Sequence, residues 1–172
     1  MANPLVNFVI RGFQFLFAIV ILGLSVSLIR HHHWGNLPAT LGFAAFVAGV
    51  SILGAFVGIA ATWVSMLDGA VGLIIDGVVA VINAAGGIAM AVKLNGVQCK
   101  VEGSDDNSLK MIENNMLNGG CLSKSICYWY TEPLKILSLC KVSQADTVFM
   151  FLTVFLLAVS AVFTFLRMRK GY

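Results

Sequence analysis

Polar side chains inside long apolar stretches are the first candidates for chemistry in this sequence. Asp76 and Asn83 lie in the apolar stretch 70–92 and, at about 100° per residue, on one face of the helix it would form. Three small residues share that face: Gly72, Ala80 and Gly87. Inside a membrane, a carboxylate costs several kcal/mol unless it is paired, hydrated or protonated, so Asp76 is a candidate functional residue.

Two interpretations of this polar face are open. In the first, Asp76 and Asn83 form a proton or cation relay in a transporter or channel. In the second, a protonated or hydrogen-bonded Asp76 locks its helix to a neighbour. The small residues around Asp76 favour the second interpretation, because they let two helices approach closely.

Other residue types that could carry chemistry give weak patterns. His31, His32 and His33 follow one another directly, so they cannot all turn toward one ion, and we expect them in a solvated loop beside the membrane. The sequence contains no Ser/His/Asp grouping, phosphate-binding Gly loop, His-Glu-x-x-His motif or dinucleotide fingerprint. Cys121 and Cys127 are too far apart for a Cys-x-x-Cys redox centre. We therefore expect no enzymatic activity, no metal site and no cofactor.

All four cysteines fall in one polar stretch, residues 93–144. An even set of cysteines in one aqueous loop is typical of disulfides formed in an oxidising compartment. Of the three possible pairings, we favour Cys99 with Cys140, which would tie the exits of two helices together, and Cys121 with Cys127 as a local clip. Four reduced thiols in a cytosolic loop are the alternative.

The composition requires that most of the chain faces lipid. Of the 172 residues, 59% are hydrophobic and 11% are charged, and the mean hydropathy is +0.90. A soluble domain with so few charges could not cover its surface with solvated groups. The 11 Lys and Arg residues are scattered and largely matched by 8 acidic residues, so we expect no nucleic-acid partner.

Four apolar stretches are long enough to cross a bilayer as helices, which takes roughly 20 residues each. They span residues 5–29, 41–64, 70–92 and 145–166. The sequence therefore predicts an all-α membrane protein, a four-helix transmembrane bundle that forms one domain over residues 1–172. The long outer loop 93–144, with its disulfides, separates the third helix from the fourth. The turn between the second and third helices is short, which makes these two helices antiparallel neighbours.

Small residues four apart on the second helix predict close helix packing. These are the pairs Gly54 and Gly58, and Ala45 and Gly49. Such spacing lets helix backbones approach closely in lipid. It is compatible both with packing inside the bundle and with packing between copies of the protein.

Some polar side chains near the helix ends are expected at the membrane surface. Arg11 lies near one end of the first helix, and its long side chain can extend toward water. Tyr128, Trp129 and Tyr130 suit the headgroup layer, because their rings combine an apolar body with a polar tip. A binding epitope is the alternative interpretation of these three residues.

An even number of spans places both termini on one side of the membrane. The basic cluster after the last helix, Arg167, Arg169 and Lys170, favours a cytoplasmic location, whereas six lysines in the outer loop oppose it. Charge alone is therefore ambiguous. The cysteines decide the prediction: loop 93–144 is extracellular and both termini are cytoplasmic.

The fourth helix is entered through the segment Cys140 to Phe151, CKVSQADTVFMF. Together with Asp76 in the third helix and Cys99 at its exit, this segment resembles the MARVEL-domain fold, specifically the fungal non-classical export protein family. The resemblance makes three residues of the segment family-motif positions: Gln144, Ala145 and Asp146.

This resemblance implies a plasma-membrane protein of eisosome-associated microdomains, linked to sphingolipid status, membrane furrows and unconventional secretion. We accordingly expect a non-enzymatic organiser that packs with its own copies, with membrane lipids such as sphingolipid or sterol, and with other microdomain proteins. A small transporter or channel using Asp76 and Asn83 is the alternative.

Overall fold

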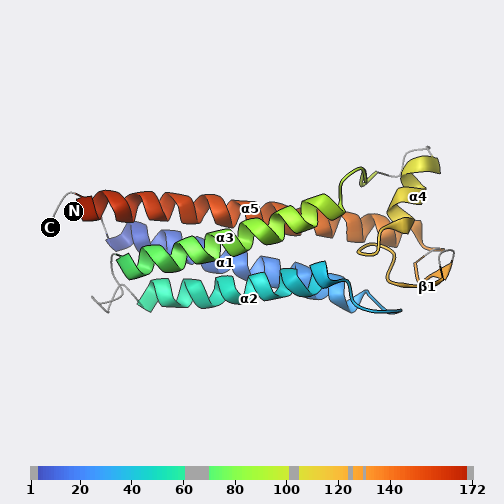
Figure 1. Cartoon of the computed structure of the whole chain (residues 1–172), viewed down its shortest axis with the longest axis horizontal. Coiled ribbons are helices and arrows are strands. Elements are labelled where there is room, and N and C mark those ends of the chain that lie inside the picture. Colours follow the sequence, from blue (N-terminus) through green and yellow to red (C-terminus); the bar gives the residue numbers. More distant parts are fainter. Residues whose placement is uncertain (1–3, 61–69, 101–104, 124–125, 130, 170–172) are drawn as a thin grey trace.

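Four long helices run side by side along the molecule (Figure 1) in a computed structural model that describes residues 4–60, 70–100, 105–123, 126–129 and 131–169. The long helices are α1 (Pro4–Arg30), α2 (Ala39–Ala60), α3 (Ala70–Lys93) and α5 (Pro133–Arg169). A short helix and a two-stranded antiparallel hairpin lie together at one end: α4 (Asp105–Glu113), β1 (Cys121–Ser123) and β2 (Ile126–Cys127). We call this end the cap; α1 begins and α5 ends at the other end (Figure 1).

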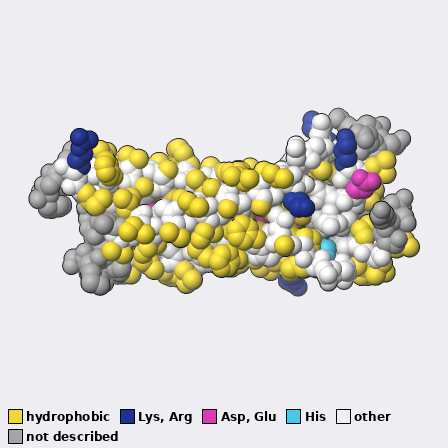
Figure 2. All heavy atoms as spheres, viewed as in Figure 1, with side chains coloured by type: hydrophobic (Ala, Val, Ile, Leu, Met, Phe, Trp, Pro, Cys, Tyr) yellow, Lys and Arg dark blue, Asp and Glu magenta, His cyan; other side chains and the backbone are white. Residues whose placement is uncertain are grey.

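The outer surface of the bundle is apolar along its length. Hydrophobic side chains cover the shaft, and the visible Lys and Arg side chains gather toward its two ends (Figure 2). Large apolar residues such as Leu53, Ile74 and Phe155 are about two-thirds exposed. In the part of the chain that the structure describes, four helices are long and apolar enough to cross a membrane. The predicted all-α bundle of four membrane helices is confirmed.

Each long helix packs against two others. Helix α1 contacts α2 and α5, and α3 contacts the same two helices, which closes the bundle. Apolar side chains from all four fill its centre, among them Ile21, Val47, Met90 and Met150. The predicted antiparallel contact between α2 and α3 is present (Figure 1), whereas the turn between them lies outside the described residues.

The last helix begins earlier than the sequence predicted. It starts at Pro133, not at residue 145, so part of the predicted outer loop is helical. The added segment carries a buried stripe at helical spacing: Ile136, Leu139, Cys140 and Ser143. Because polar residues alternate with this stripe, a search for continuous apolar stretches detects only the later, lipid-facing part of the helix. The second helix was predicted over 41–64; the described helix starts at Ala39, and residues 61–64 lie outside the described residues.

Two disulfides brace the cap. Cys99 after α3 bonds to Cys140 within α5, and Cys121 in β1 bonds to Cys127, its partner in β2. This is the pairing favoured from the sequence. Gly120 precedes β1 with φ of 92°, where the left-handed backbone and the nearby Trp34 carbonyl leave no room for a side chain.

The chain after α1 contacts the cap: His31 and His32 are half-buried, whereas His33 is exposed, as the predicted solvated loop requires. The backbone N–H of His33 donates to the Gly119 carbonyl at 2.7 Å, and its ring lies 4.3 Å from that of Tyr128. Trp129 Nε1 donates to the His31 carbonyl at 3.0 Å. Tyr128 and Trp129 thus hold the α1–α2 connection to the hairpin, instead of serving only as headgroup anchors. Tyr130 lies outside the described residues.

Candidate functional site

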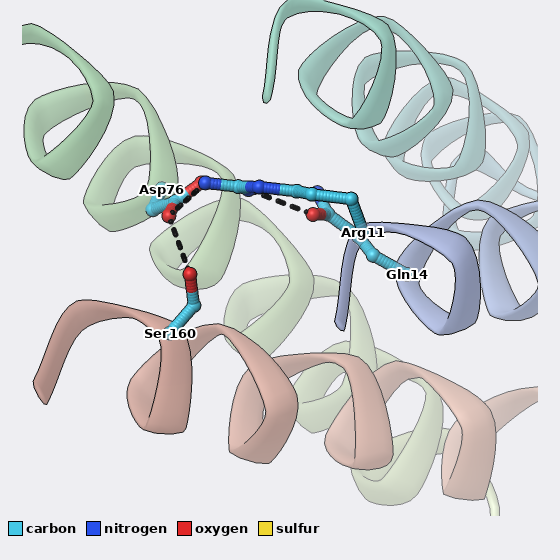
Figure 3. Close-up of polar contacts among 4 residues, drawn as sticks. All are labelled: Arg11, Gln14, Asp76 and Ser160. Carbon is cyan, nitrogen blue, oxygen red and sulfur yellow. Dashed lines mark hydrogen bonds and ion pairs between the residues drawn. The ribbon is translucent and has the colours of Figure 1, made fainter. Parts of the chain in front are cut away.

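A buried ion pair joins α1 to α3. Arg11 Nη1 donates to Asp76 Oδ1 at 2.5 Å and Nη2 donates to Oδ2 at 2.7 Å, a bidentate geometry (Figure 3). The two residues are only 5% and 2% exposed. Arg11 lies seven residues after the first residue of α1 and Asp76 lies six residues after the first residue of α3, which places each roughly 10 Å along its helix at about 1.5 Å per residue.

The prediction that Arg11 extends to the membrane surface is therefore wrong. A buried guanidinium needs a compensating charge, and Asp76 supplies it across the helix interface. The sequence gives Asp76 as a candidate but does not identify its partner, because 65 residues separate the two positions. One sequence signal could have identified the pair. Arg11 and Asp76 carry opposite charges and lie at similar distances from the first residues of their helices.

Hydrogen bonds extend the ion pair to a third helix. Ser160 Oγ on α5 donates to Asp76 Oδ2 at 3.2 Å, and Arg11 Nη1 also donates to Gln14 Oε1 at 2.9 Å (Figure 3). We call these four residues the polar lock: Arg11, Gln14, Asp76 and Ser160. Both carboxylate oxygens of Asp76 therefore accept hydrogen bonds: Oδ1 from Arg11, and Oδ2 from Arg11 and Ser160.

Helix α2 contributes glycines that make room for the polar lock. A Cβ at Gly58 would lie 2.5 Å from Arg11 Nε, and a Cβ at Gly54 would lie 2.8 Å from the Val79 side chain and 3.6 Å from Gln14 Nε2. The Gly54 and Gly58 pair, predicted to pack either inside the bundle or between copies, packs inside it. All four long helices therefore meet at the polar lock.

The second small pair on α2 has a different environment. Gly49 and Ala45 are half-buried, and no atom would lie within 4 Å of a Cβ added at Gly49. This pair is not used for close packing within the described bundle. Its predicted role in helix contact stays a prediction.

Asn83 belongs to a separate contact. Its Nδ2 donates to Ser51 Oγ on α2 at 2.7 Å and to the Val79 carbonyl at 2.8 Å. Asn83 lies seven residues, or roughly 10 Å, beyond Asp76 along α3. Among the described residues, no hydrogen bond joins Asn83 to the polar lock, so the structure does not assemble Asp76 and Asn83 into one site.

The small residues of the predicted face on α3 divide between environments. Gly87 is buried under the Phe151 ring of α5, 3.1 Å from where its Cβ would be. Gly72 and Ala80 are only half-buried. Gly86, which is not on the predicted face, is packed equally closely: a Cβ added there would lie 3.0 Å from the Val47 side chain and 3.1 Å from the Met150 sulfur.

A second buried acid lies in α5. Asp146 is 0% exposed and accepts a hydrogen bond from Ser25 Oγ of α1 at 2.8 Å. From the sequence, Asp146 was predicted to be a motif residue at the start of the fourth helix, because the continuous apolar stretch begins at residue 145. Its motif neighbours differ: Gln144 is exposed and Ala145 is half-buried.

These buried polar groups join helices. The polar lock, the Asn83–Ser51 contact and the Asp146–Ser25 contact together link α1 to α3, α3 to α5, α2 to α3 and α1 to α5. In lipid, where water cannot satisfy them, such contacts fix which helices meet and in which register. Fold and site together define a small membrane protein whose helices are held by buried polar contacts.

Comparison with protein families agrees with this class. The model of the MARVEL family, described as a membrane-associating domain, matches residues 4–163, which is nearly the whole chain. The protein belongs to the MARVEL family. A search of curated proteins and a search of solved structures gave no match.

Proposed function

We propose that this protein is a non-enzymatic organiser of plasma-membrane microdomains, which associates laterally with lipids and with its own copies. The observation that carries the proposal is the Arg11–Asp76 ion pair, in which the most costly charges of the bundle neutralise each other. A group that must release protons or ions needs a path and a free oxygen, whereas Asp76 is saturated by Arg11 and Ser160. Membership of a membrane-associating family supports the same interpretation.

The finer assignment follows the sequence resemblance. The segment Cys140 to Phe151 supports placement near the fungal non-classical export proteins, and with it a role in eisosome-type domains, sphingolipid or sterol association and unconventional secretion. The half-buried Ala45 and Gly49 on α2 supply a surface for a second copy or for another microdomain protein. We place loop 93–144 outside the cell and both termini in the cytoplasm, which two disulfides at the cap support.

Reconstitution tests the organiser function. We expect fluorescently labelled protein in giant vesicles to cluster in single-particle tracking, and to enrich sphingolipid or sterol around itself. Gly49→Leu should reduce clustering, because it places a bulky side chain on the proposed contact surface, while Ile74→Phe on the exposed face of α3 serves as a control away from that surface. Freely diffusing monomers in all lipid mixtures would contradict the proposal.

The transporter alternative predicts a different result in the same vesicles. Proton or cation flux that depends on the protein, and that Asp76→Asn abolishes, would replace the organiser function. The variant must stay folded for this comparison, so Asp76→Asn is combined with Arg11→Gln, which leaves no unpaired buried charge. We expect no flux from the wild type or from either variant.

A further inference from the structure

A cavity of about 430 Å³ opens between the end of α1, the cap and the start of α5. Its lining includes Gly23, Val26, Arg30, His33, Trp129 and Lys135. Residues 23, 26 and 30 lie on one face of α1, so the cavity follows that helix for about two turns. It is separate from the polar lock, which lies toward the opposite end of α1.

Two cations line this cavity without a counter-charge. None of the lining residues is acidic, and no carboxylate of the described residues lies within ion-pair distance of Arg30 or Lys135. Arg11 shows the contrast, because its charge is neutralised by Asp76. The cavity is therefore an unneutralised positive site at the end of a membrane helix.

Its aromatic wall is held in place by the cap. Trp129 donates Nε1–H to the His31 carbonyl at 3.0 Å, and Lys135 Nζ lies 5.5 Å from the centre of the Trp129 ring. This cation–π contact limits where the ammonium group can go. One cation of the site is thus oriented before any ligand arrives, which lowers the entropy lost on binding.

The lining of the cavity changes along α1 from charged at the helix end to apolar deeper in the bundle. Arg30 ends the helix, whereas Gly23 lies seven residues earlier, roughly 10 Å deeper in the apolar part. A ligand that fills the cavity would meet positive charge at the membrane surface and an apolar wall below it. This is the order of groups in a phospholipid, with phosphate above and acyl chain below.

We propose that this cavity binds a phosphate group, with Arg30 and Lys135 as its cationic contacts and Val26 against the chain of a lipid carrier. Guanidinium groups bind phosphate oxygens in pairs, and a lysine adds a point charge beside them. The phosphate could come from an anionic phospholipid or from solution, and the apolar wall favours the lipid. The inference deepens the proposed function, on which it rests for the presence of membrane lipid around the bundle.

Native mass spectrometry of the purified full chain in detergent tests the site. The probes are dioleoyl phosphatidylglycerol, dioleoyl phosphatidylcholine and, in a separate arm, inorganic phosphate. We expect the anionic lipid to bind more tightly than the zwitterionic one, and Arg30→Gln with Lys135→Gln to weaken it about tenfold or more. Lys93→Gln with Lys141→Gln removes the same charge from exposed positions outside the cavity and should change nothing.

Each outcome has a distinct meaning. Displacement of the lipid by millimolar inorganic phosphate, with the same dependence on Arg30 and Lys135, would support the phosphate site and identify solution phosphate as a ligand. Equal losses in the cavity and control variants, or no loss in either, would overturn the proposal. Clustering in vesicles without headgroup preference would refute this site alone, whereas headgroup binding without clustering would refute the organiser function alone.

Discussion

At the scale of single residues, the bundle depends on a charge pair that neither partner could maintain alone. Arg11 and Asp76 are both buried, and each supplies the charge that makes burial of the other tolerable. Ser160 donates a further hydrogen bond to Asp76, and Gln14 accepts one from Arg11. We therefore propose that Asp76 selects the register of α3 against α1 and α5.

Removing one charge should destabilise the protein strongly. We expect Asp76→Asn or Arg11→Gln alone to lower the free energy of unfolding by about 3–5 kcal/mol, because the remaining charge stays buried without a partner. The double variant should recover most of this loss. Thermal or denaturant unfolding in detergent measures it, and additive losses in the double variant would contradict a direct pair.

Gly58 provides a second residue-scale test. Gly58→Ala should cost about 1–3 kcal/mol, because the new Cβ would lie 2.5 Å from Arg11 Nε and force the guanidinium to move. Gly49→Ala on the same helix is the matched control, since a Cβ there meets no atom within 4 Å. Unfolding of both variants in the same detergent decides the matter; equal stabilities would mean that Gly58 makes no special room for Arg11.

At the scale of elements, the long α5 connects the membrane bundle to the cap. Its first turns carry Cys140, which is bonded to Cys99 beyond the end of α3. The bond closes a long stretch of chain, with a sequence separation of 41, whereas Cys121–Cys127 closes one of 6. Entropy of loop closure then ranks the first bond as the greater contributor to stability.

Removal of each disulfide should reveal this ranking. On the chain-entropy estimate, Cys99→Ser with Cys140→Ser should lower the unfolding free energy by about 4 kcal/mol. The Cys121→Ser and Cys127→Ser pair should lower it by about 2 kcal/mol. Unfolding under non-reducing conditions gives both values, and a larger loss from the short hairpin bond would show that the cap depends on local geometry more than on loop closure.

At the scale of the whole molecule, α1 begins and α5 ends at one end of the bundle, and the disulfides lie at the other (Figure 1). A membrane-impermeant maleimide applied to intact cells should therefore label the cysteines only after reduction with an impermeant phosphine. Labelling without reductant would contradict the disulfides, and labelling only after permeabilisation would reverse the proposed orientation.

Much of the architecture could be predicted from the sequence because continuous apolar stretches are a local property. The bounds of α1 and α3 were predicted to within one residue, since each stretch ends where polar residues begin. The start of α5 was not, because residues 133–144 form an amphipathic helix whose buried face is recognisable only against its neighbours. Asp146 was consequently missed as a buried acid.

By itself, the sequence determined that this is a membrane protein with four spans, that Asp76 is costly and needs compensation, and that the cysteines share one loop region. These follow from composition and local order along the chain. Only the tertiary structure decided that Arg11 is the partner of Asp76, that Gly58 makes room for both, and that Arg30 and Lys135 line one cavity. Partners far apart in sequence are chosen by helix register and rotation, which are set by packing among all four helices together.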